Sequence, residues 1–482
     1  MGMSSDPFSS LAAEARAFDI ADPGSLQALD GGGLPTAWVG RATIGGRSAL
    51  LALTDGHQRG GTIGISEAKL LGQLASAIAK APPEIIVVCW DTGGVRVEEG
   101  PVALAAASAF GVSLARASLS GVSLAAVVSG PRGCFGAPAV IAALSQRVIL
   151  TEDAHWGLTG PRLLQVHEQP AAEEIGLSST SARHRFREGH ASLIVGDSGK
   201  DIREALVDFA QRQRRSPDPL EVLQSCVARI DRLVAKLQAS RQGEQNDTAV
   251  VEPARRQRDL LRFSFRGHWR PGTPLVRRGL VNAAWGLLDG RPALGIIVGS
   301  EGVRRDGVGI EDAYAVAEIV RFAARESHDN PAPILTFLFC QGHAVELSQE
   351  RSGLHCALAE CLRSFVAARM LGHPLMCVLG GGAYGAAYLA FAAPSHRVLA
   401  IRGTSVAPMA PRTLAAFRSL RGLREAAETP PQMAELIPEV KIVDSIVRLP
   451  TVLRAELDAL KQELQSTATA MRNPKRANAR RV

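Results

Sequence analysis

Two pairs of glycine-rich turns are the features of this 482-residue sequence best suited to chemistry. In each half of the chain, two apolar runs of strand type end in small residues just before a helical pattern. Such an end points backbone N–H groups without partners at one spot, where the helix dipole favours negative charge. Glycine is needed there because a side chain would keep a ligand from the amides. The expected ligand is a negative oxygen of a phosphate, a carboxylate or a thioester enolate.

The turns predict two oxyanion sites, one in each half of the chain. Backbone donors aimed at a developing oxyanion can each be worth roughly 10²- to 10³-fold in rate. A single turn of this kind more often only permits a tight chain reversal, but four turns at matched places favour the oxyanion interpretation. The donors are expected at or near Gly93, Gly94, Cys134 and Phe135 in the first half and Gly342, Gly382, Ala383 and Tyr384 in the second, with Gly133, Gly136, Gly381 and Gly385 completing the substrate-binding turns.

Five side chains beside these turns are candidates for direct roles. Arg96 follows a glycine turn and could hold a carboxylate or phosphate as a fork-like donor, or it could be a capping arginine. His155 could supply or relay a proton, or simply pack beside the next residue. His343 and Tyr384 are further proton-donor candidates, with a loop histidine and a buried tyrosine as the alternatives. Cys134 lacks an identifiable activating base, which favours a small buried residue over a nucleophile.

The elements that must position these residues occur twice along the chain. Each half shows a hairpin, a helical stretch, a buried strand ending in glycine, a helix, and a second strand ending in glycine. The hairpins fall at 37–55 and 276–298 and the helical stretches at 66–80 and 310–325. The offset between the copies is 249 residues from Gly136 to Gly385. An internal duplication therefore sets the architecture.

The duplication predicts two tandem α/β domains packed as a pseudo-dimer, with a site between them. The expected segments are an N-terminal extension at 1–30, domains at 31–240 and 260–470, a polar linker at 241–259 and a basic tail at 471–482.

Composition narrows the class of protein. The chain has 46% hydrophobic and 21% charged residues, which is ordinary for a globular protein and excludes a wholly disordered one. Seven cysteines without a CxxC pair favour reduced thiols, and the N-terminus lacks a signal-peptide pattern, so we expect a cytoplasmic location. Glycine and proline interrupt the most apolar stretches, so no membrane span is expected. The net charge of +7 comes without a nucleic-acid motif and suits anionic thioesters or an acidic carrier protein.

Other motifs with chemical meaning carry little weight. His355, Cys356 and Cys361 lack the spacing of zinc ligands, so no metal site is expected. The glycines at 380–385 match the GxGxxG dinucleotide fingerprint, but the next strand brings no acidic residue for a ribose. There is no GxSxG elbow and no GxxxxGK[ST] loop.

Short motifs in both halves of the chain carry a resemblance to a known family. The motifs in the first half are Gly60-Gly61-Thr62-Ile63-Gly64, Trp90-Asp91-Thr92-Gly93-Gly94-Val95-Arg96, Gly133-Cys134-Phe135-Gly136 and Gly157-Leu158-Thr159-Gly160-Pro161. Those in the second half are Leu354-His355, Ala367-Ala368-Arg369-Met370-Leu371-Gly372-His373-Pro374 and the glycines ending at Gly385. Together they resemble the carboxyltransferase branch of the crotonase superfamily, the first half being similar to the β subunit of biotin-independent malonate decarboxylase and the second half to its γ subunit. The resemblance implies two crotonase-like carboxyltransferase domains and a fusion of β and γ subunits.

The resemblance implies decarboxylation of a malonyl thioester on an acyl carrier protein, in malonate catabolism. Loss of carbon dioxide leaves an enolate whose oxygen needs stabilisation and whose carbon needs a proton. The family implies no covalently bound cofactor in this chain. It also implies partners in a multi-subunit complex: an acyl carrier protein with a CoA-like prosthetic group, and a transferase that loads malonate.

Two further functions stay open. One is carboxyl transfer to biotin, which would need a separate biotin protein because the chain has no Met-Lys-Met attachment site. The other is a non-catalytic scaffold that docks carrier protein. The scaffold alternative is based on departures from the γ pattern, which occur at Cys340-Gln341-Gly342-His343, Tyr384 and Val406-Ala407-Pro408-Met409.

Overall fold

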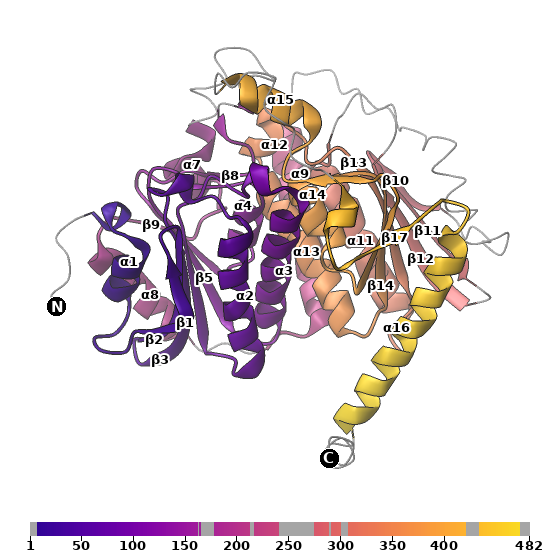
Figure 1. Cartoon of the computed structure of the whole chain (residues 1–482), viewed down its shortest axis with the longest axis horizontal. Coiled ribbons are helices and arrows are strands. Elements are labelled where there is room, and N and C mark those ends of the chain that lie inside the picture. Colours follow the sequence, from indigo (N-terminus) through magenta and orange to yellow (C-terminus); the bar gives the residue numbers. More distant parts are fainter. Residues whose placement is uncertain are drawn as a thin grey trace.

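Two β-sheets separated by helices form the body of the protein in the computed structural model (Figure 1). The structure describes residues 7–161, 163–164, 178–212, 216–240, 274–288, 291–299, 307–420 and 433–472. The expected linker lies outside these residues, as does nearly all of the basic tail.

The first sheet has seven strands in the order β1-β2-β3-β4-β5-β7-β9. An antiparallel meander of β1, β2 and β3 leads into the parallel strands β4, β5, β7 and β9. The two-stranded β6–β8 ladder stands apart. The strands are β1 (Gln27–Leu34), β2 (Ala37–Ile44), β3 (Arg47–Thr54), β4 (Ile85–Trp90), β5 (Ser123–Val128), β6 (Cys134–Phe135), β7 (Arg147–Thr151), β8 (Trp156–Gly157) and β9 (Leu193–Val195).

The second sheet repeats this pattern in the order β10-β11-β12-β13-β14-β15-β17, with β16 paired to the end of β14. The β14–β16 pairing corresponds to the separate β6–β8 ladder of the first half. These strands are β10 (Pro274–Arg278), β11 (Val281–Leu288), β12 (Arg291–Val298), β13 (Ile334–Cys340), β14 (Leu375–Tyr384), β15 (Arg397–Ile401), β16 (Ser405–Ala407) and β17 (Val440–Val443).

Helices from both halves fill the space between the sheets, where α3 lies beside α13 (Figure 1). Helix α9 belongs to the first half by sequence but packs against α11 and α13 of the second. The longer helices are α1 (Ala13–Ile20), α2 (Ile65–Lys80), α3 (Gly100–Leu119), α8 (Gly199–Ala210), α9 (Pro219–Ser240), α11 (Ile310–Glu326), α13 (Leu354–Met370), α15 (Pro411–Leu420) and α16 (Leu449–Arg472). The shorter ones are α4 (Ala137–Ala142), α7 (Ala182–Arg187), α12 (Leu347–Arg351), α14 (Gly385–Ala387) and the single-turn elements η1 (Phe8–Ser10), η2 (Arg59–Gly61), η3 (Val97–Glu99), η4 (Tyr388–Ala392) and η5 (Ala434–Leu436).

Each sheet is covered on both faces, which explains why its central strands are apolar throughout. Along β4, Ile86, Val88 and Trp90 face the helices between the sheets. The alternate residues of β4 face α1 and α8 on the outer side. Helix α16 covers the outer face of the second sheet through Leu449, Leu453, Leu457 and Leu460, which share one helix face.

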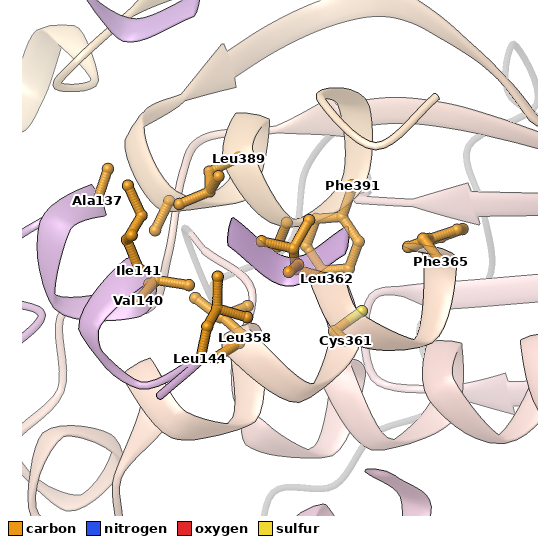
Figure 2. Packing of buried hydrophobic residues seen from close by; sticks show 14 of the residues in the cluster. Ala137, Val140, Ile141, Leu144, Leu358, Cys361, Leu362, Phe365, Leu389 and Phe391 are labelled. Carbon is orange, nitrogen blue, oxygen red and sulfur yellow. The ribbon is translucent and has the colours of Figure 1, made fainter. Parts of the chain in front are cut away.

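An apolar interface joins the two halves directly. Figure 2 shows side chains of α4 in the first half lying against side chains of α13 and η4 in the second. Ile141 and Leu389 come so close at this interface that a Cβ on Gly111 would meet both. Because the glycine turn at Gly136 leads into α4, packing of α4 against the second half helps hold that turn in place.

The two α/β units and the internal duplication expected from the sequence are confirmed, and the expected hairpins and helices are present. The proposed domain boundaries stay predictions. The segment Val97–Leu119 is long and apolar enough to cross a membrane by composition. It packs against α2, α13 and η4, and 61% of its most apolar window is buried, as is typical of a core helix.

Candidate functional site

The turns after β4 and β13 have the same geometry. Gly94 and Gly342 lie in the left-handed region with φ of 112° and 107°. The amide of Gly94 donates to the hydroxyl of Thr92 over 3.1 Å, and the amide of Gly342 donates to the thiol of Cys340 over 3.2 Å. Because a side chain is strained at these φ values, both positions require glycine.

The four donors expected in the first half are already used within the protein. The amide of Gly93 donates to Gly60 over 2.9 Å, and that of Gly94 donates to Thr92. The amides of Cys134 and Phe135 donate to the carbonyls of His155 and Thr92 over 2.9 and 3.3 Å. The amides of these four residues therefore have acceptors within the protein, so a donor open to a ligand has to lie near them and not at these positions.

The backbone amide of Val95, the residue after Gly94, does not take part in these hydrogen bonds. Ile63 donates to the carbonyl of Gly94 over 2.9 Å, and Arg96 donates to the carbonyl of Ile63 over 2.8 Å. Val95 lies between these two bonds, and its N–H has no acceptor in the described part of the chain. Ala137, the first residue of α4, adds an amide that the helix leaves without an intrahelical acceptor.

The second half repeats this arrangement at His343. Val308 donates to the carbonyl of Gly342 over 2.9 Å, and Ala344 donates to the carbonyl of Val308 over 2.9 Å. Within the described residues, the amide of His343 has no acceptor. Val95 and His343 are thus matching backbone donors of the two repeats.

Gly380, Gly381 and Gly382 lie in strand β14, which corrects the turn expected there and argues against a dinucleotide loop. β14 runs through them to Tyr384 and pairs with β16 from Gly382 to Tyr384, with Ala383 also opposite Cys340. A Cβ at Gly382 would come within 2.3 Å of the Tyr384 ring, so small residues are needed here to admit an aromatic ring. Gly381 likewise lies under Phe339. Strand pairing and ring packing explain this stretch, and its amides form no open turn.

Two glycines do mark the helix starts. Gly136 has a φ of 67° before α4, and Gly385 has a φ of 51° at the start of α14. A Cβ at Gly385 would come within 2.8 Å of the Pro408 carbonyl. At Gly133 a Cβ would meet the carbonyl of His155 at 2.2 Å. All three glycines are required by backbone conformation or close approach.

The buried carboxylate of Asp91 ties the first glycine turn to neighbouring loops through hydrogen bonds. Asp91 is fully buried and accepts hydrogen bonds from the amides of Gly56 and Arg132 over 3.1 and 2.9 Å. Cβ atoms at Gly56 or Gly130 would come within 2.5 Å of the carboxylate. Burial raises the pKa of Asp91, while these bonds and nearby cations oppose that shift.

A loop of the first half reaches the turn of the second. The hydroxyl of Thr159 lies 3.1 Å from Nε2 of His343, across 184 residues of sequence. Glu350 in α12 accepts hydrogen bonds from the amides of Leu158 and Thr159 over 3.1 and 2.8 Å. Arg185 in α7 donates to the same carboxylate over 2.5 Å. The loop after β8 is therefore fixed to the second half through both Glu350 and His343.

This loop joins the two glycine turns into one region. The amide of Gly136 donates to the carbonyl of Leu158 over 3.1 Å. The neighbouring residue Thr159 contacts His343, and Gly342 lies against Tyr384, with 3.6 Å between the added Cβ position and the Tyr384 Cβ. The structure thus brings together predicted residues from both halves, at the junction of the two repeats.

The Arg185–Glu350 pair is the electrostatic centre of this junction. The side chain of Arg185 is 0% exposed and that of Glu350 is 2% exposed. Burial lowers the pKa of Arg185, and the charge of Glu350 opposes that shift. Arg185 also donates to the carbonyls of Trp156 and Glu350. A buried pair of this kind is strongly destabilising to break because the remaining partner is left as an uncompensated charge.

His343 is held in its neutral form. Burial lowers its pKa from 6.5 to about 4, so at neutral pH the ring carries no charge and either accepts from or donates to Thr159.

The pKa of His343 leads to a prediction for acid stability. The unfolded chain binds a proton at this residue near pH 6.5, whereas the folded chain binds it only near pH 4. The stability is therefore present above pH 6.5 and is lost as the pH falls from 6.5 to 4. In His343→Gln we expect unfolding to take up about one proton fewer between pH 4 and pH 6.5, so the unfolding free energy should depend less steeply on pH in this range. Urea titrations at successive pH values measure this, and a wild-type slope in the variant would contradict it.

The other candidate side chains have structural partners. Arg96 is 8% exposed and donates to Glu67, Glu99 and Thr62, which holds the start of α2. It is therefore a structural arginine, and the expected substrate contact does not fit. Nδ1 of His155 lies 3.0 Å from the hydroxyl of Thr180, and burial lowers the pKa of His155.

Cys134 is fully buried, and burial raises the pKa of its thiol well above the usual value. This environment fits the small buried residue favoured from the sequence and does not suit a nucleophile. Among the described residues there is also no group of three or more histidine, cysteine or acidic side chains suited to a metal ion.

Four functional candidates were missed at the sequence level: Val95, Ala137, Glu350 and Arg185. Val95 and Ala137 directly follow the predicted glycines Gly94 and Gly136, but which amides lack an acceptor depends on pairing with distant segments. Glu350 and Arg185 lie in helices without a distinctive motif, and only their burial identifies them.

Known proteins match different parts of the chain. Residues 303–481 match the family described as malonate decarboxylase gamma subunit. The malonyl-S-ACP:biotin-protein carboxyltransferase MADC of Malonomonas rubra is 25% identical over 195 residues, covering 36% of this chain and 60% of the relative. The acetyl-coenzyme A carboxylase carboxyl transferase subunits beta/alpha of Salinispora tropica are 26% identical over 216 residues, covering 39% of this chain. The chain thus spans 60% and 37% of the lengths of these two curated relatives.

Solved structures give similar matches. The Pseudomonas malonate decarboxylase MdcD-MdcE hetero-dimer is similar at 29% identity and a TM-score of 0.37, over 44% of this chain and 90% of that one. The transcarboxylase 12S structure with methylmalonyl-coenzyme A is similar at 19% identity and a TM-score of 0.37, over 95% of this chain and 90% of that one.

The duplicated sheets with paired turns define a two-domain α/β protein, parts of which are similar to carboxyltransferases. More specifically, its second half is similar to the malonate decarboxylase gamma subunit family, which matches residues 303–481.

Proposed function

We propose that the chain decarboxylates a malonyl thioester carried on an acyl carrier protein, giving an acetyl thioester and carbon dioxide in malonate catabolism. The observation that carries this proposal is the match of residues 303–481 to the malonate decarboxylase γ-subunit family. The name of the Malonomonas relative, which acts on malonyl-S-ACP, supports the same substrate.

The junction of the two halves is the proposed place of reaction. The bond between the malonyl carboxylate and its α-carbon breaks, carbon dioxide leaves, and the electron pair moves into an enolate with a negative thioester oxygen. Backbone amides at Val95 and Ala137, or at His343, would donate to this oxygen. A proton delivered to the α-carbon then completes the acetyl group, with His343, Tyr384 and His155 as the candidate donors.

The proposal includes partner proteins and a cytoplasmic location. The substrate would arrive on the CoA-like prosthetic group of an acyl carrier protein, after a separate transferase has loaded malonate. The chain itself would need no covalently bound cofactor. A multi-subunit assembly is consistent with the Pseudomonas malonate decarboxylase, which was solved as a hetero-tetramer in complex with malonate.

A second candidate is carboxyl transfer to biotin. It is favoured by one observation, that the Malonomonas relative is named for transfer to a biotin protein. In that case carbon dioxide would leave only through a biotinylated partner. A carrier-docking scaffold without turnover is the third outcome that the experiment separates.

The test is release of labelled carbon dioxide from malonyl-carrier protein by the purified full chain, with and without avidin. We expect prompt release that avidin does not change. Release that needs added biotin protein and stops with avidin would favour carboxyl transfer. Carrier binding without any release would refute the decarboxylase and favour the scaffold.

A further inference from the structure

A cavity of about 900 Å³ opens on the side of the first half away from the glycine turns. It is bounded by α9, by α13 and by the edge of the first sheet where β5 and β7 begin. The glycine turns follow the opposite ends of these parallel strands. A cavity of this volume is in the range of small-molecule sites, and it lies between the two halves.

One face of α9 lines the cavity over four turns. The lining positions include Val222, Ser225, Arg229 and Lys236, whose spacings of three, four and seven residues place them on the same side of a helix. This wall therefore carries both apolar and cationic side chains.

The charged groups of the cavity leave an excess of positive charge. Glu360 is shared by two guanidinium groups, with Arg229 at 2.7 Å and Arg363 at 2.5 Å. Lys236 pairs with Glu188 over 3.1 Å. Two cations therefore face a single buried carboxylate, and an anion entering the cavity would compensate the remaining charge.

Arg232 is the cation best placed to meet such an anion. It is exposed on α9 and lines the cavity, and in the described part of the chain it has no ion-pair or hydrogen-bond partner. Glu221, the remaining acid of the lining, is exposed on α9. Nε of Arg229 is also buried without a partner. Guanidinium groups bind carboxylates and phosphates in a planar, two-point geometry.

The floor of the cavity suits an apolar or aromatic body. Trp156 is fully buried, and Leu119, Val148 and Leu233 add apolar surface. Nε2 of His190 is buried without a hydrogen-bond partner. Burial and the charge of Arg185 hold the pKa of His190 well below its usual value, so the ring offers a neutral polar group.

We propose that this cavity is a second binding site, which takes a small organic anion with its carboxylate or phosphate at Arg232 and Arg229 and its apolar body against the apolar side chains of the lining. The site is separate from the proposed decarboxylation site. Its ligand contacts α9, α13 and the first sheet at once, so binding would hold the two halves together.

Isothermal titration calorimetry of the full chain tests the proposal with defined probes. The probes are phenyl phosphate, phenylacetate, inorganic phosphate and the neutral 2-phenylethanol. We expect the first, the second or both to bind at one site, and the bare anion and the neutral alcohol to bind at least about tenfold more weakly. Binding of phenyl phosphate alone or phenylacetate alone identifies which anionic group the site prefers. Equal binding of inorganic phosphate would overturn an organic ligand.

Two variants locate the binding. Arg232→Met removes a cation that supports no other described residue, and we expect about 10- to 100-fold weaker binding of the organic anion. Ser225→Phe fills the cavity and should abolish binding. Arg212→Met, at an exposed pair with Asp208, is the matched control and should bind as wild type does. Unchanged affinity in both test variants, or no binding of any probe, would refute the site.

A third variant separates this site from the proposed function. Gly94→Val changes a residue of the turn after β4 that does not line the cavity. We expect it to retain full binding of the organic anion. Because calorimetry needs no turnover, failure of the decarboxylase assay would leave this result intact.

Discussion

Glu350→Gln is expected to cost about 3–5 kcal/mol of the free energy of unfolding. The substitution keeps the shape of the side chain but removes the charge that faces Arg185 at 2.5 Å in a fully buried environment. It also places an amide NH₂ opposite the N–H groups of Leu158 and Thr159. The loop that carries Thr159 should then shift away from His343, and carbon dioxide release should fall about 100-fold. Urea denaturation and the release assay measure the two effects.

Two further variants make this prediction specific. Arg185→Lys keeps the charge but loses the fork geometry and should give an intermediate loss of stability. Glu84→Gln removes one partner of a pair with Arg47 in which the side chains are 37% and 49% exposed, and it should leave the unfolding curve unchanged. A Glu350→Gln chain as stable as Glu84→Gln would show that the junction does not depend on this carboxylate.

Gly94→Val is expected to lower carbon dioxide release at least about 100-fold while leaving the overall fold intact. At a φ of 112° a β-branched residue is strained by about 1–3 kcal/mol. The new Cβ would also lie 3.4 Å from the carbonyl of Phe135. Both effects should displace the amide of Val95, the donor proposed for the enolate oxygen. Single-turnover release and circular dichroism together separate lost chemistry from lost structure.

Two glycine controls isolate the cause. Gly46 has a φ of 77° in the β2–β3 hairpin, and nothing lies within 4 Å of an added Cβ. Gly46→Val therefore introduces a similar backbone strain at a position outside the candidate site. Gly72 in α2 is also open around its Cβ position and has no positive φ. Both controls should keep wild-type release. An equal loss in Gly46→Val would assign the effect to strain alone.

Much of the candidate site could be located from the sequence, but not its individual donors. Strand patterns placed Gly94 and Gly342 at matched ends of β4 and β13, where the structure has them. The hydrogen bonds of Gly93 and Cys134 depend on Gly60 and His155, which approach from other loops. Which amide stays without a partner is therefore decided by pairing between distant segments.

The glycines at 380–382 also show that local composition does not decide the structure. Their composition indicates a turn, yet β14 continues through them because β16 supplies a strand partner at Gly382–Tyr384. The rings of Phe339 and Tyr384 occupy the space that these glycines leave. Local composition permits either structure, and the partner strand selects one.

The sequence by itself determined the duplication, the two α/β domains and the positions of the paired turns, because hydrophobic periodicity and glycine placement act over short stretches of chain. Only the tertiary structure decided that Thr159 meets His343 and that Glu350 binds Arg185, across 184 and 165 residues. It also decided that Arg96 serves as a structural arginine instead of a substrate contact. These outcomes depend on burial and on the packing of one half against the other, which no local pattern encodes.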